Sequence, residues 1–278
     1  MTSRPHRSAL YVPADRPGAL ARAAGLGADI LILDLEDAVA PGAKDAARAA
    51  VAALPPPKVP RSPLRALRIN AAGTPWHEAD LEMAARLRPD AVVLPKAGAA
   101  EDAARAAAAL PEGIALWAMI ETAAGVLAAP AIAAAPRVAA LVVGTNDLAA
   151  ELRTQGRAAL SHALQRTVLA ARAAGAVALD GVCNAFRDEE ALRAECREGR
   201  ALGFDGKTLI HPSQVAVANA VFAPSAEEVD LARRRIAAFR AAEAAGNGVA
   251  VLDGRIVEAL HASEARRVLA MADAVAAR

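Results

Sequence analysis

The sequence has almost no net charge, few cysteines and no long uncharged apolar run. Its 278 residues contain 32 Lys and Arg against 31 Asp and Glu, which argues against a strongly basic surface for nucleic acid or membranes. No stretch of 18 uncharged apolar residues occurs, so we expect no membrane span. The apolar stretch after the basic N-terminus breaks at Pro13, Asp15 and Arg16, too early for a signal peptide. We therefore expect a cytoplasmic protein.

Cysteine and lysine are both scarce. Cys183 and Cys196 lack CxxC spacing, which indicates reduced thiols and not a disulfide framework. Only four lysines occur in a chain rich in Ala and Arg, so a Lys carries more information here than an Arg does. With 55% hydrophobic and 23% charged residues, the composition excludes disorder and is typical of a globular protein.

Short apolar segments alternate with longer Ala-rich helical stretches. The predicted strands are residues 10–12, 30–35, 64–69, 91–94, 114–120, 138–143, 177–182 and 208–210. The predicted helices between and after them are residues 17–24, 43–53, 76–86, 100–110, 122–129, 160–174, 188–202 and 213–222. Several strands are apolar on both faces, as buried parallel strands are.

Eight strand–helix units predict a TIM (β/α)8 barrel over residues 1–222. An open doubly wound sheet is the alternative, which the missing GxGxxG after the first strand disfavours. The proline-rich stretches at 55–57 and 60–63 predict a surface loop. Residues 223–278 follow the repeat, and we expect a C-terminal helical extension with helices at 226–244 and 263–276.

Polar side chains follow nearly every predicted strand. They are Asp34-Leu35-Glu36-Asp37, Arg68, Asn70, Lys96, Glu121, Gly144-Thr145-Asn146-Asp147, Asp180 and His211. Active sites of such barrels lie at the carboxyl ends of the strands, so these residues predict a site at that rim. The alternative is that loops simply begin with polar residues.

Glu121 and Asp147 are the candidate metal ligands. They lie one strand–helix unit apart, so they are expected at the ends of adjacent strands, which are separated by ~4.8 Å. Two carboxylates so close would repel, and a hard divalent ion removes the conflict. Mg²⁺ binds through one or two carboxylates, whereas no His or Cys cluster supports zinc. Alternatively, each carboxylate forms a salt bridge with one of the many arginines.

Each of the other rim residues has two possible roles. Arg68 is expected to clamp a carboxylate or hold an enolate oxygen, or to be a solvated rim charge. Glu36 and Asp37 could bind metal-bound waters, whereas Asp34 and Asp37 could instead cap the next helix. Lys96 could form a Schiff base with a carbonyl substrate, or could pair with the rim acids.

These segments together resemble the citrate lyase beta-subunit-like family, the CoA-ester lyases of the HpcH/HpaI aldolase group. The matching segments are SALYVP at 8–13, DLEDAV at 34–39, RIN at 68–70, VLPK at 93–96, IETAAG at 120–125, GTNDL at 144–148, DGV at 180–182 and GKTLIHPSQ at 206–214. The resemblance implies a TIM barrel, commonly a trimer or hexamer. It also implies cleavage or formation of a carbon–carbon bond in β-hydroxyacyl thioesters.

The resemblance assigns roles to individual residues. It implies that Glu121 and Asp147 hold Mg²⁺, that Arg68 contacts substrate oxygens, and that Glu36 and Asp37 contact metal-bound waters.

The C-terminal segment GRIVEAL, residues 254–260, aligns with a family segment that supplies an acid/base aspartate to a neighbouring subunit. Here Glu258 stands where the aspartate is usual, and Leu260 stands where proline is usual. Catalytic reach is sensitive at the 1 Å level, so this longer side chain puts the acid/base step in question. We expect residues 223–278 to pack on a neighbouring subunit and Glu258 to be the acid/base.

We therefore predict a Mg²⁺-dependent carbon–carbon lyase acting on a short β-hydroxyacyl-CoA such as malyl-CoA or citramalyl-CoA. Arg16, which follows the first strand, and Lys96 are candidate substrate contacts. The alternatives are a thioesterase or synthase on the same CoA esters, a Schiff-base aldolase through Lys96, and a non-catalytic subunit of a larger lyase complex. A homotrimer or hexamer is expected, with no nucleic-acid or membrane partner.

Overall fold

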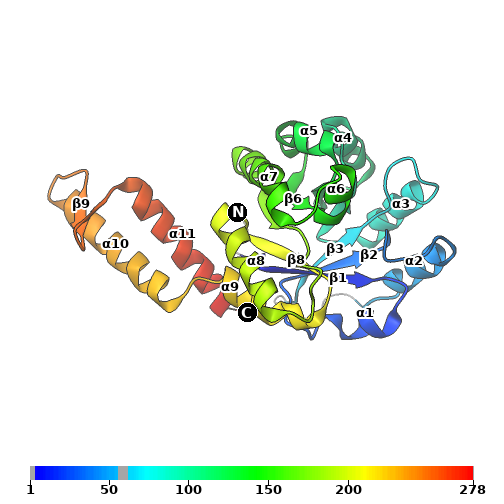
Figure 1. Ribbon diagram of the computed structural model, residues 1–278, viewed down its shortest axis with the longest axis horizontal. Helices are drawn as coiled ribbons and strands as arrows, with labels where there is room; N and C mark the ends of the chain where they lie inside the picture. Colours follow the sequence, from blue (N-terminus) through cyan, green and yellow to red (C-terminus); the bar gives the residue numbers. More distant parts are fainter. Residues whose placement is uncertain (1–3, 56–61, 278) are drawn as a thin grey trace. The chain divides into compact units, whose positions relative to one another are not determined.

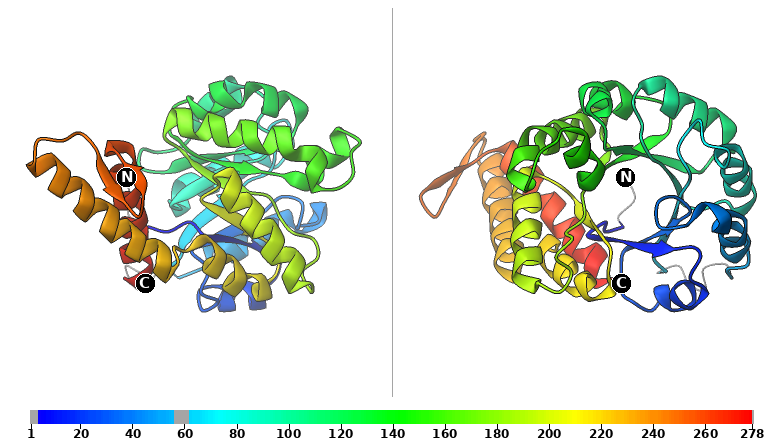
Figure 2. Two further views of the ribbon diagram at one scale, coloured as in Figure 1. Left: turned by 60° about the vertical axis from the view of Figure 1, so that its left-hand side comes forward. Right: turned by 45° about the vertical axis from the view of Figure 1, so that its right-hand side comes forward.

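Eight parallel strands close into a barrel in the part of the chain that the structure describes, residues 4–55 and 62–277 of a computed structural model. The strands are β1 (Ser8–Pro13), β2 (Ile30–Asp34), β3 (Leu64–Arg68), β4 (Ala91–Leu94), β5 (Ala115–Ile120), β6 (Val138–Val143), β7 (Val177–Asp180) and β8 (Gly206–Leu209). Each strand pairs with the next in sequence, and β1 also pairs with β8, which closes the ring (Figure 2). The predicted TIM barrel is confirmed, and the open doubly wound sheet is not formed.

Helices follow the strands and surround the barrel (Figure 1). They are α1 (Pro17–Ala23), α2 (Lys44–Ala52), α3 (His77–Leu87), α4 (Ala100–Ala109), α5 (Ala123–Ala133), α6 (Thr145–Glu151), α7 (Ser161–Ala174), α8 (Glu189–Leu202) and α9 (Val215–Phe222). The described chain also contains short 3-10 helices: η1 (Pro41–Ala43), η2 (Arg157–Leu160) and η3 (Pro212–Gln214). The seven-residue helix α6 is not among the predicted helices.

Alternate residues of each strand point to opposite sides of the sheet, and this alternation separates two cores. One set fills the inside of the barrel: Ala9, Ile30, Ile32, Ala66, Ala91, Val93, Trp117, Met119, Ala140, Val142 and Leu179. The intervening residues, such as Leu31 and Leu33, pack in a second cluster with residues from the helices. Continuing the inward set along β2, β3 and β5 leads to Asp34, Arg68 and Glu121. The alternation thus aims these side chains into the carboxyl end of the barrel.

The barrel unit is His6–Phe222, and the residues from Ala223 onward belong to a second compact unit. This unit contains α10 (Ala226–Ala244), the antiparallel strands β9 (Ala250–Leu252) and β10 (Arg255–Val257), and α11 (Ala259–Ala276). Asp253 and Gly254, with φ of 50° and 73°, form the Asp-Gly turn that joins the two strands. The last helix therefore begins four residues before the predicted start at 263, and the hairpin was not predicted.

Most of the predicted proline-rich loop lies outside the described residues, since 56–61 are not described. Among the described helices, none is both long and apolar enough to cross a membrane.

Candidate active site

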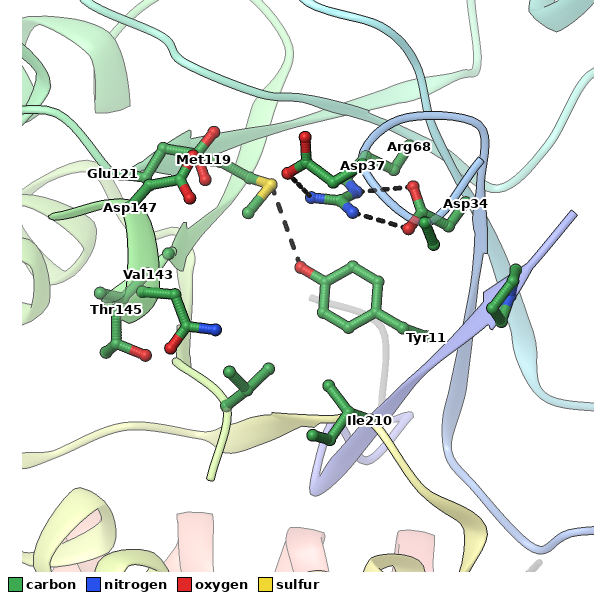
Figure 3. A pocket seen from close by; sticks show the side chains of 15 residues that line it. Tyr11, Asp34, Asp37, Arg68, Met119, Glu121, Val143, Thr145, Asp147 and Ile210 are labelled. Atoms are coloured by element: carbon green, nitrogen blue, oxygen red, sulfur yellow. Dashed lines mark hydrogen bonds and ion pairs between the residues drawn. The ribbon is translucent and has the colours of Figure 1, made fainter. Parts of the chain in front are cut away.

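A pocket of about 370 Å³ opens at the carboxyl ends of the barrel strands (Figure 3). Its lining comprises Tyr11, Pro13, Asp34, Asp37, Ala38, Arg68, Met119, Glu121, Val143, Gly144, Thr145, Asn146, Asp147, Val182 and Ile210. Asp34 and Arg68 are the last residues of β2 and β3, and Glu121 directly follows β5. The rim at which polar residues were expected therefore does line a pocket.

Arg68 is held at the pocket by acidic neighbours. Its Nε and Nη2 donate to the two carboxylate oxygens of Asp34 at 2.7 and 2.6 Å, and its Nη1 lies 2.7 Å from Glu36 Oε2. The guanidinium also stacks on the ring of Tyr11, 4.9 Å from its centroid. Arg68 is 8% exposed, so it is not a solvated rim charge. A guanidinium has five N–H donors, and two of them are hydrogen-bonded to Asp34.

The charge of Arg68 is secured by its surroundings. Burial disfavours the charged guanidinium, but the hydrogen bonds and negative charge of Asp34 hold the pKa of Arg68 well above its ordinary value. Asp34 also accepts a hydrogen bond from the backbone N–H of Glu36 at 2.9 Å. The expectation that Asp34 and Asp37 cap the next helix is wrong, because Ala40 and Ala43 occupy the cap positions of η1 and α2 without side-chain caps.

Glu36 is a buried carboxyl with incomplete hydrogen bonding. It forms the ion pair with Arg68, but neither of its oxygens accepts a hydrogen bond of good geometry within the described residues. Burial raises the pKa of Glu36 to about 8, although the Arg68 charge opposes this shift. Asp37, by contrast, has a 58% exposed side chain and lies 3.6 Å from the Arg68 guanidinium. Whether either acid contacts metal-bound water remains a prediction.

Lys44 fixes the loop that carries these acids, and the sequence reasoning missed it. Its ammonium is buried and donates to the carbonyl oxygens of Leu35 and Glu36 at 2.7 and 2.8 Å and to Asn70 Oδ1 at 2.6 Å. It also lies over the ring of Trp76, 5.0 Å from the centroid. The scarcity of lysine was the available signal, but no sequence pattern showed that this lysine points inward.

Glu121 and Asp147 come from neighbouring units of the barrel, as expected. Their strands β5 and β6 pair directly, with Ile120 opposite Val143. Asp147 does not end a strand but lies in the first turn of α6. Both carboxylates line the pocket on the side across from Arg68 (Figure 3).

The two candidate ligands differ in environment. Glu121 is 3% exposed, and its Oε1 accepts the backbone N–H of Lys96 at 2.7 Å. Burial raises the pKa of Glu121 to about 7; the charge of Asp147 adds to the shift and the Lys96 N–H opposes it. Asp147 has a 39% exposed side chain, and its Oδ2 lies 3.7 Å from the Lys96 ammonium. The cation beside Asp147 is thus a lysine and not an arginine.

The donor set fits magnesium. No group of three or more His, Cys, Asp or Glu side chains placed to hold a metal occurs among the described residues. Mg²⁺ needs only one or two carboxylates, because water and substrate oxygens complete its octahedron. Gly144 leaves the space that Glu121 needs, since a Cβ at Gly144 would lie 2.5 Å from the Glu121 Cβ. A buried carboxylate and an exposed one, both facing the same pocket, suit a hard cation with open positions.

The rest of the pocket combines apolar walls with hydroxyls that lack strong partners. Thr145 Oγ1 is buried without a hydrogen-bond partner among the described residues. Among the residues that the structure describes, the Tyr11 hydroxyl has Met119 Sδ as its one hydrogen-bond partner, at 4.0 Å. Val182 and Ile210 complete the apolar side. Such a pocket offers donors to a ligand oxygen and apolar surface to its carbon chain.

Four predicted site residues, Glu36 among them, are not part of the pocket lining. Lys96 and Arg16 are not among the lining residues, and Arg16 is exposed at the start of α1. Burial lowers the pKa of Lys96, but Glu36, Asp37 and Asp147 outweigh this and raise it. A Schiff-base lysine needs an unprotonated amine, so this environment disfavours that role. Glu258 is an exposed residue of the second unit, directly before α11, and its acid/base role remains a prediction.

The sequence model of the HpcH/HpaI aldolase/citrate lyase family matches residues 7–212. The chain belongs to this family. Its members include CoA-ester lyases, so the resemblance seen in the sequence motifs is confirmed.

Two relatives from Cereibacter sphaeroides align over nearly their whole length. The (3S)-malyl-CoA thioesterase is 51% identical over 278 residues, covering 99% of this chain and 97% of the relative. The L-malyl-CoA/beta-methylmalyl-CoA lyase is 35% identical over 309 residues, with the same two coverages.

Solved structures of the family agree with the fold. The protein CitE from Mycobacterium tuberculosis, in complex with magnesium, acetoacetate and coenzyme A, has a TM-score of 0.83 and 35% identity. That comparison covers 98% of this chain and all of the other. A further structure of that citrate lyase beta subunit contains oxaloacetate and magnesium, with a TM-score of 0.72 and 37% identity over 81% of this chain.

Proposed function

We propose that this protein is a magnesium-dependent thioesterase that hydrolyses the CoA ester of a short hydroxydicarboxylic acid, malyl-CoA in the first instance. The observation that carries the proposal is the pocket in which Glu121 and Asp147 face Arg68. The 51% identity to a (3S)-malyl-CoA thioesterase over almost the whole chain supports the choice of reaction. It refines the predicted lyase toward the thioesterase alternative.

The pocket suits the acyl part of such a substrate. Its volume of about 370 Å³ is at the small end of ligand pockets, large enough for a four-carbon acid but not for CoA as well. The acid's free carboxylate would meet the remaining Arg68 donors or the Thr145 hydroxyl. The CoA portion would lie outside the pocket, where Arg16 and Lys96 are its candidate contacts.

Glu121 and Asp147 would hold Mg²⁺, which supplies a Lewis acid for the substrate's oxygens. Arg68 would stabilise the negative charge that collects on the thioester oxygen when water adds to the carbonyl carbon. Preorganised donors of this type are worth ~3–4 kcal/mol in the barrier. Asp37 lines the pocket and meets solvent, so its carboxylate would take the proton from the attacking water. The carbon–sulfur bond then breaks, and the proton passes to the CoA thiolate.

Carbon–carbon cleavage is the second candidate, supported by the full-length similarity to the malyl-CoA lyase. In that reaction Arg68 would hold the enolate oxygen of the acetyl thioester. Glu258, which we propose to enter from a neighbouring subunit of a trimer or hexamer, would donate a proton to the acetyl carbon. The products would then be an oxo acid and an acyl-CoA, with no free thiol.

Product analysis decides between the two reactions. The purified full-length protein is incubated with malyl-CoA and Mg²⁺, with and without EDTA, while free thiol and glyoxylate are measured separately. We expect free CoA thiol and intact malate, loss of activity with EDTA, and recovery with added Mg²⁺. Glyoxylate without thiol would favour the lyase. If the folded protein neither hydrolyses nor cleaves malyl-CoA, both proposed reactions are refuted. The remaining alternative would then be a non-catalytic subunit of a larger lyase complex.

A further inference from the structure

Lys96 has an unusual backbone conformation immediately after β4. Its φ is +51°, in the left-handed region that glycine adopts freely and that is unfavourable for a residue with a side chain. Such outliers tend to persist where the surrounding structure holds them for a function. A lysine at this position therefore invites the question of what its side chain does.

The conformation lets one residue contact both candidate metal ligands through two different groups. The backbone N–H of Lys96 donates to Glu121 Oε1 at 2.7 Å. Its ammonium lies 3.7 Å from Asp147 Oδ2. Within residues 4–55 and 62–277, Lys96 is the only side chain that forms an ion pair with Asp147.

The charges around the pocket explain why a cation is held here. Asp34, Asp37, Glu121 and Asp147 all line the pocket, and Arg68 is the only Lys or Arg in the described lining. Arg68 is engaged by Asp34 and by Glu36, on the opposite side from Asp147. The negative charge of Asp147 is therefore balanced by Lys96 when no metal is bound.

We propose that the Lys96 ammonium is an internal counter-cation that competes with Mg²⁺ for Asp147, so that metal binding displaces it. This inference rests on the proposed function, since it takes Glu121 and Asp147 as the metal site. The backbone N–H of Lys96 keeps Glu121 in place in both states, and only the side chain moves. The side chain is 46% exposed, which leaves it free to swing toward solvent. The displaced ammonium is then available to an anionic group of the substrate at the rim.

The competition has a direct consequence for metal affinity. An ammonium within 4 Å of a ligand carboxylate opposes a second cation, but both groups are about two-fifths exposed, which weakens the effect. Replacing Lys96 by methionine removes the charge and retains the N–H that holds Glu121. We expect Lys96→Met to bind divalent metal about 1.5- to 5-fold more tightly than the wild type.

The test measures metal binding and not turnover. Mn²⁺ is titrated into the metal-free full-length protein and followed by electron paramagnetic resonance, with Mg²⁺ as competitor. Lys96→Met is compared with Lys96→Arg, which keeps the positive charge. Arg88→Met serves as the matched control. Arg88, which directly follows α3, also has φ of +51°, but its side chain donates to the carbonyl oxygen of Glu112. Thermal melting establishes that each variant is folded.

We expect tighter Mn²⁺ binding only in Lys96→Met, with Arg88→Met equal to the wild type and Lys96→Arg no tighter than it. Equal or weaker binding by folded Lys96→Met, while the wild type binds Mn²⁺, would overturn the counter-cation role and leave the metal site standing. Absence of binding in both wild type and Lys96→Met would overturn the proposed metal site itself, and this inference with it.

Discussion

Replacing Gly144 by alanine probes the position of Glu121 without touching its carboxylate. Gly144 lies between β6 and α6, and an added Cβ would be 2.5 Å from the Glu121 Cβ and closer still to its Oε2. Contacts below 3.0 Å are not tolerated, so Glu121 or the start of α6 must shift. Reaching an ordinary separation of 3.4 Å requires a displacement of 3.4 − 2.5, or about 0.9 Å.

The size of this shift sets the expected effect. A misplacement of ~1 Å in a catalytic group can cost ~100-fold in rate. We therefore expect Gly144→Ala to lower kcat/KM for malyl-CoA hydrolysis by about two orders of magnitude. Overpacking of this kind also costs ~1–3 kcal/mol of stability, so the variant should melt at a lower temperature but remain folded. Mn²⁺ binding should weaken in parallel, because Glu121 is displaced.

The assay follows released CoA thiol with a chromogenic disulfide, at saturating Mg²⁺ and several substrate concentrations. Gly42→Ala is the matched control, because an added Cβ there meets no atom within 4 Å and should change neither activity nor stability appreciably. A folded Gly144→Ala protein with kcat/KM within twofold of the wild type would refute the reasoning. It would mean either that Glu121 is not needed or that its position is not sensitive.

Three other substitutions test the surrounding network. Arg68→Lys should lower kcat/KM by ~100- to 1,000-fold in the thiol assay, because a lysine cannot replace the paired contacts with Asp34, and near-normal activity would argue against the proposed role. Lys44→Met removes three hydrogen bonds and leaves the Leu35 carbonyl and Asn70 Oδ1 without that donor, whereas the Glu36 carbonyl keeps the N–H of Val39. The variant should lose ~1–3 kcal/mol in urea unfolding, so an unchanged midpoint would contradict this role. Glu36, whose pKa is raised to about 8, contributes stability below its ordinary pKa of 4.5 that is lost as the pH rises through 8. The melting temperature of metal-free wild type should therefore fall relative to Glu36→Gln between pH 5 and 8, and parallel curves would exclude this.

The barrel could be predicted because the same strand–helix pattern occurs eight times along the sequence. Eight apolar segments, each followed by a helical stretch, leave few alternative topologies, and all eight strands are present. Helix α6 and the hairpin of β9 and β10 were not predicted. Helix α6 has only seven residues and a polar start, and β9 and β10 have three residues each, so their periodicity is too brief to read.

The sequence predicts candidate residues at the carboxyl-end rim but not the contacts that they make, and their roles remain predictions. Consecutive parallel strands are neighbours, which brings Glu121 and Asp147 to one pocket. Which cation meets which acid depends on side-chain directions and distances that the order of residues does not specify. The sequence therefore pointed to Arg68 but not to its bidentate partner Asp34. It likewise did not reveal Lys44, which reaches from α2 under the loop after β2.

The pairing of β1 with β8 also has a consequence for synthesis on the ribosome. Ser8 pairs with Lys207, 199 residues later in the chain. At translation rates of roughly 5–20 residues per second, about 10–40 seconds pass between the emergence of these two strands. During that interval one edge of β1 has no native partner and can pair with other nascent chains. Slower elongation between these two strands should therefore increase the demand for chaperones.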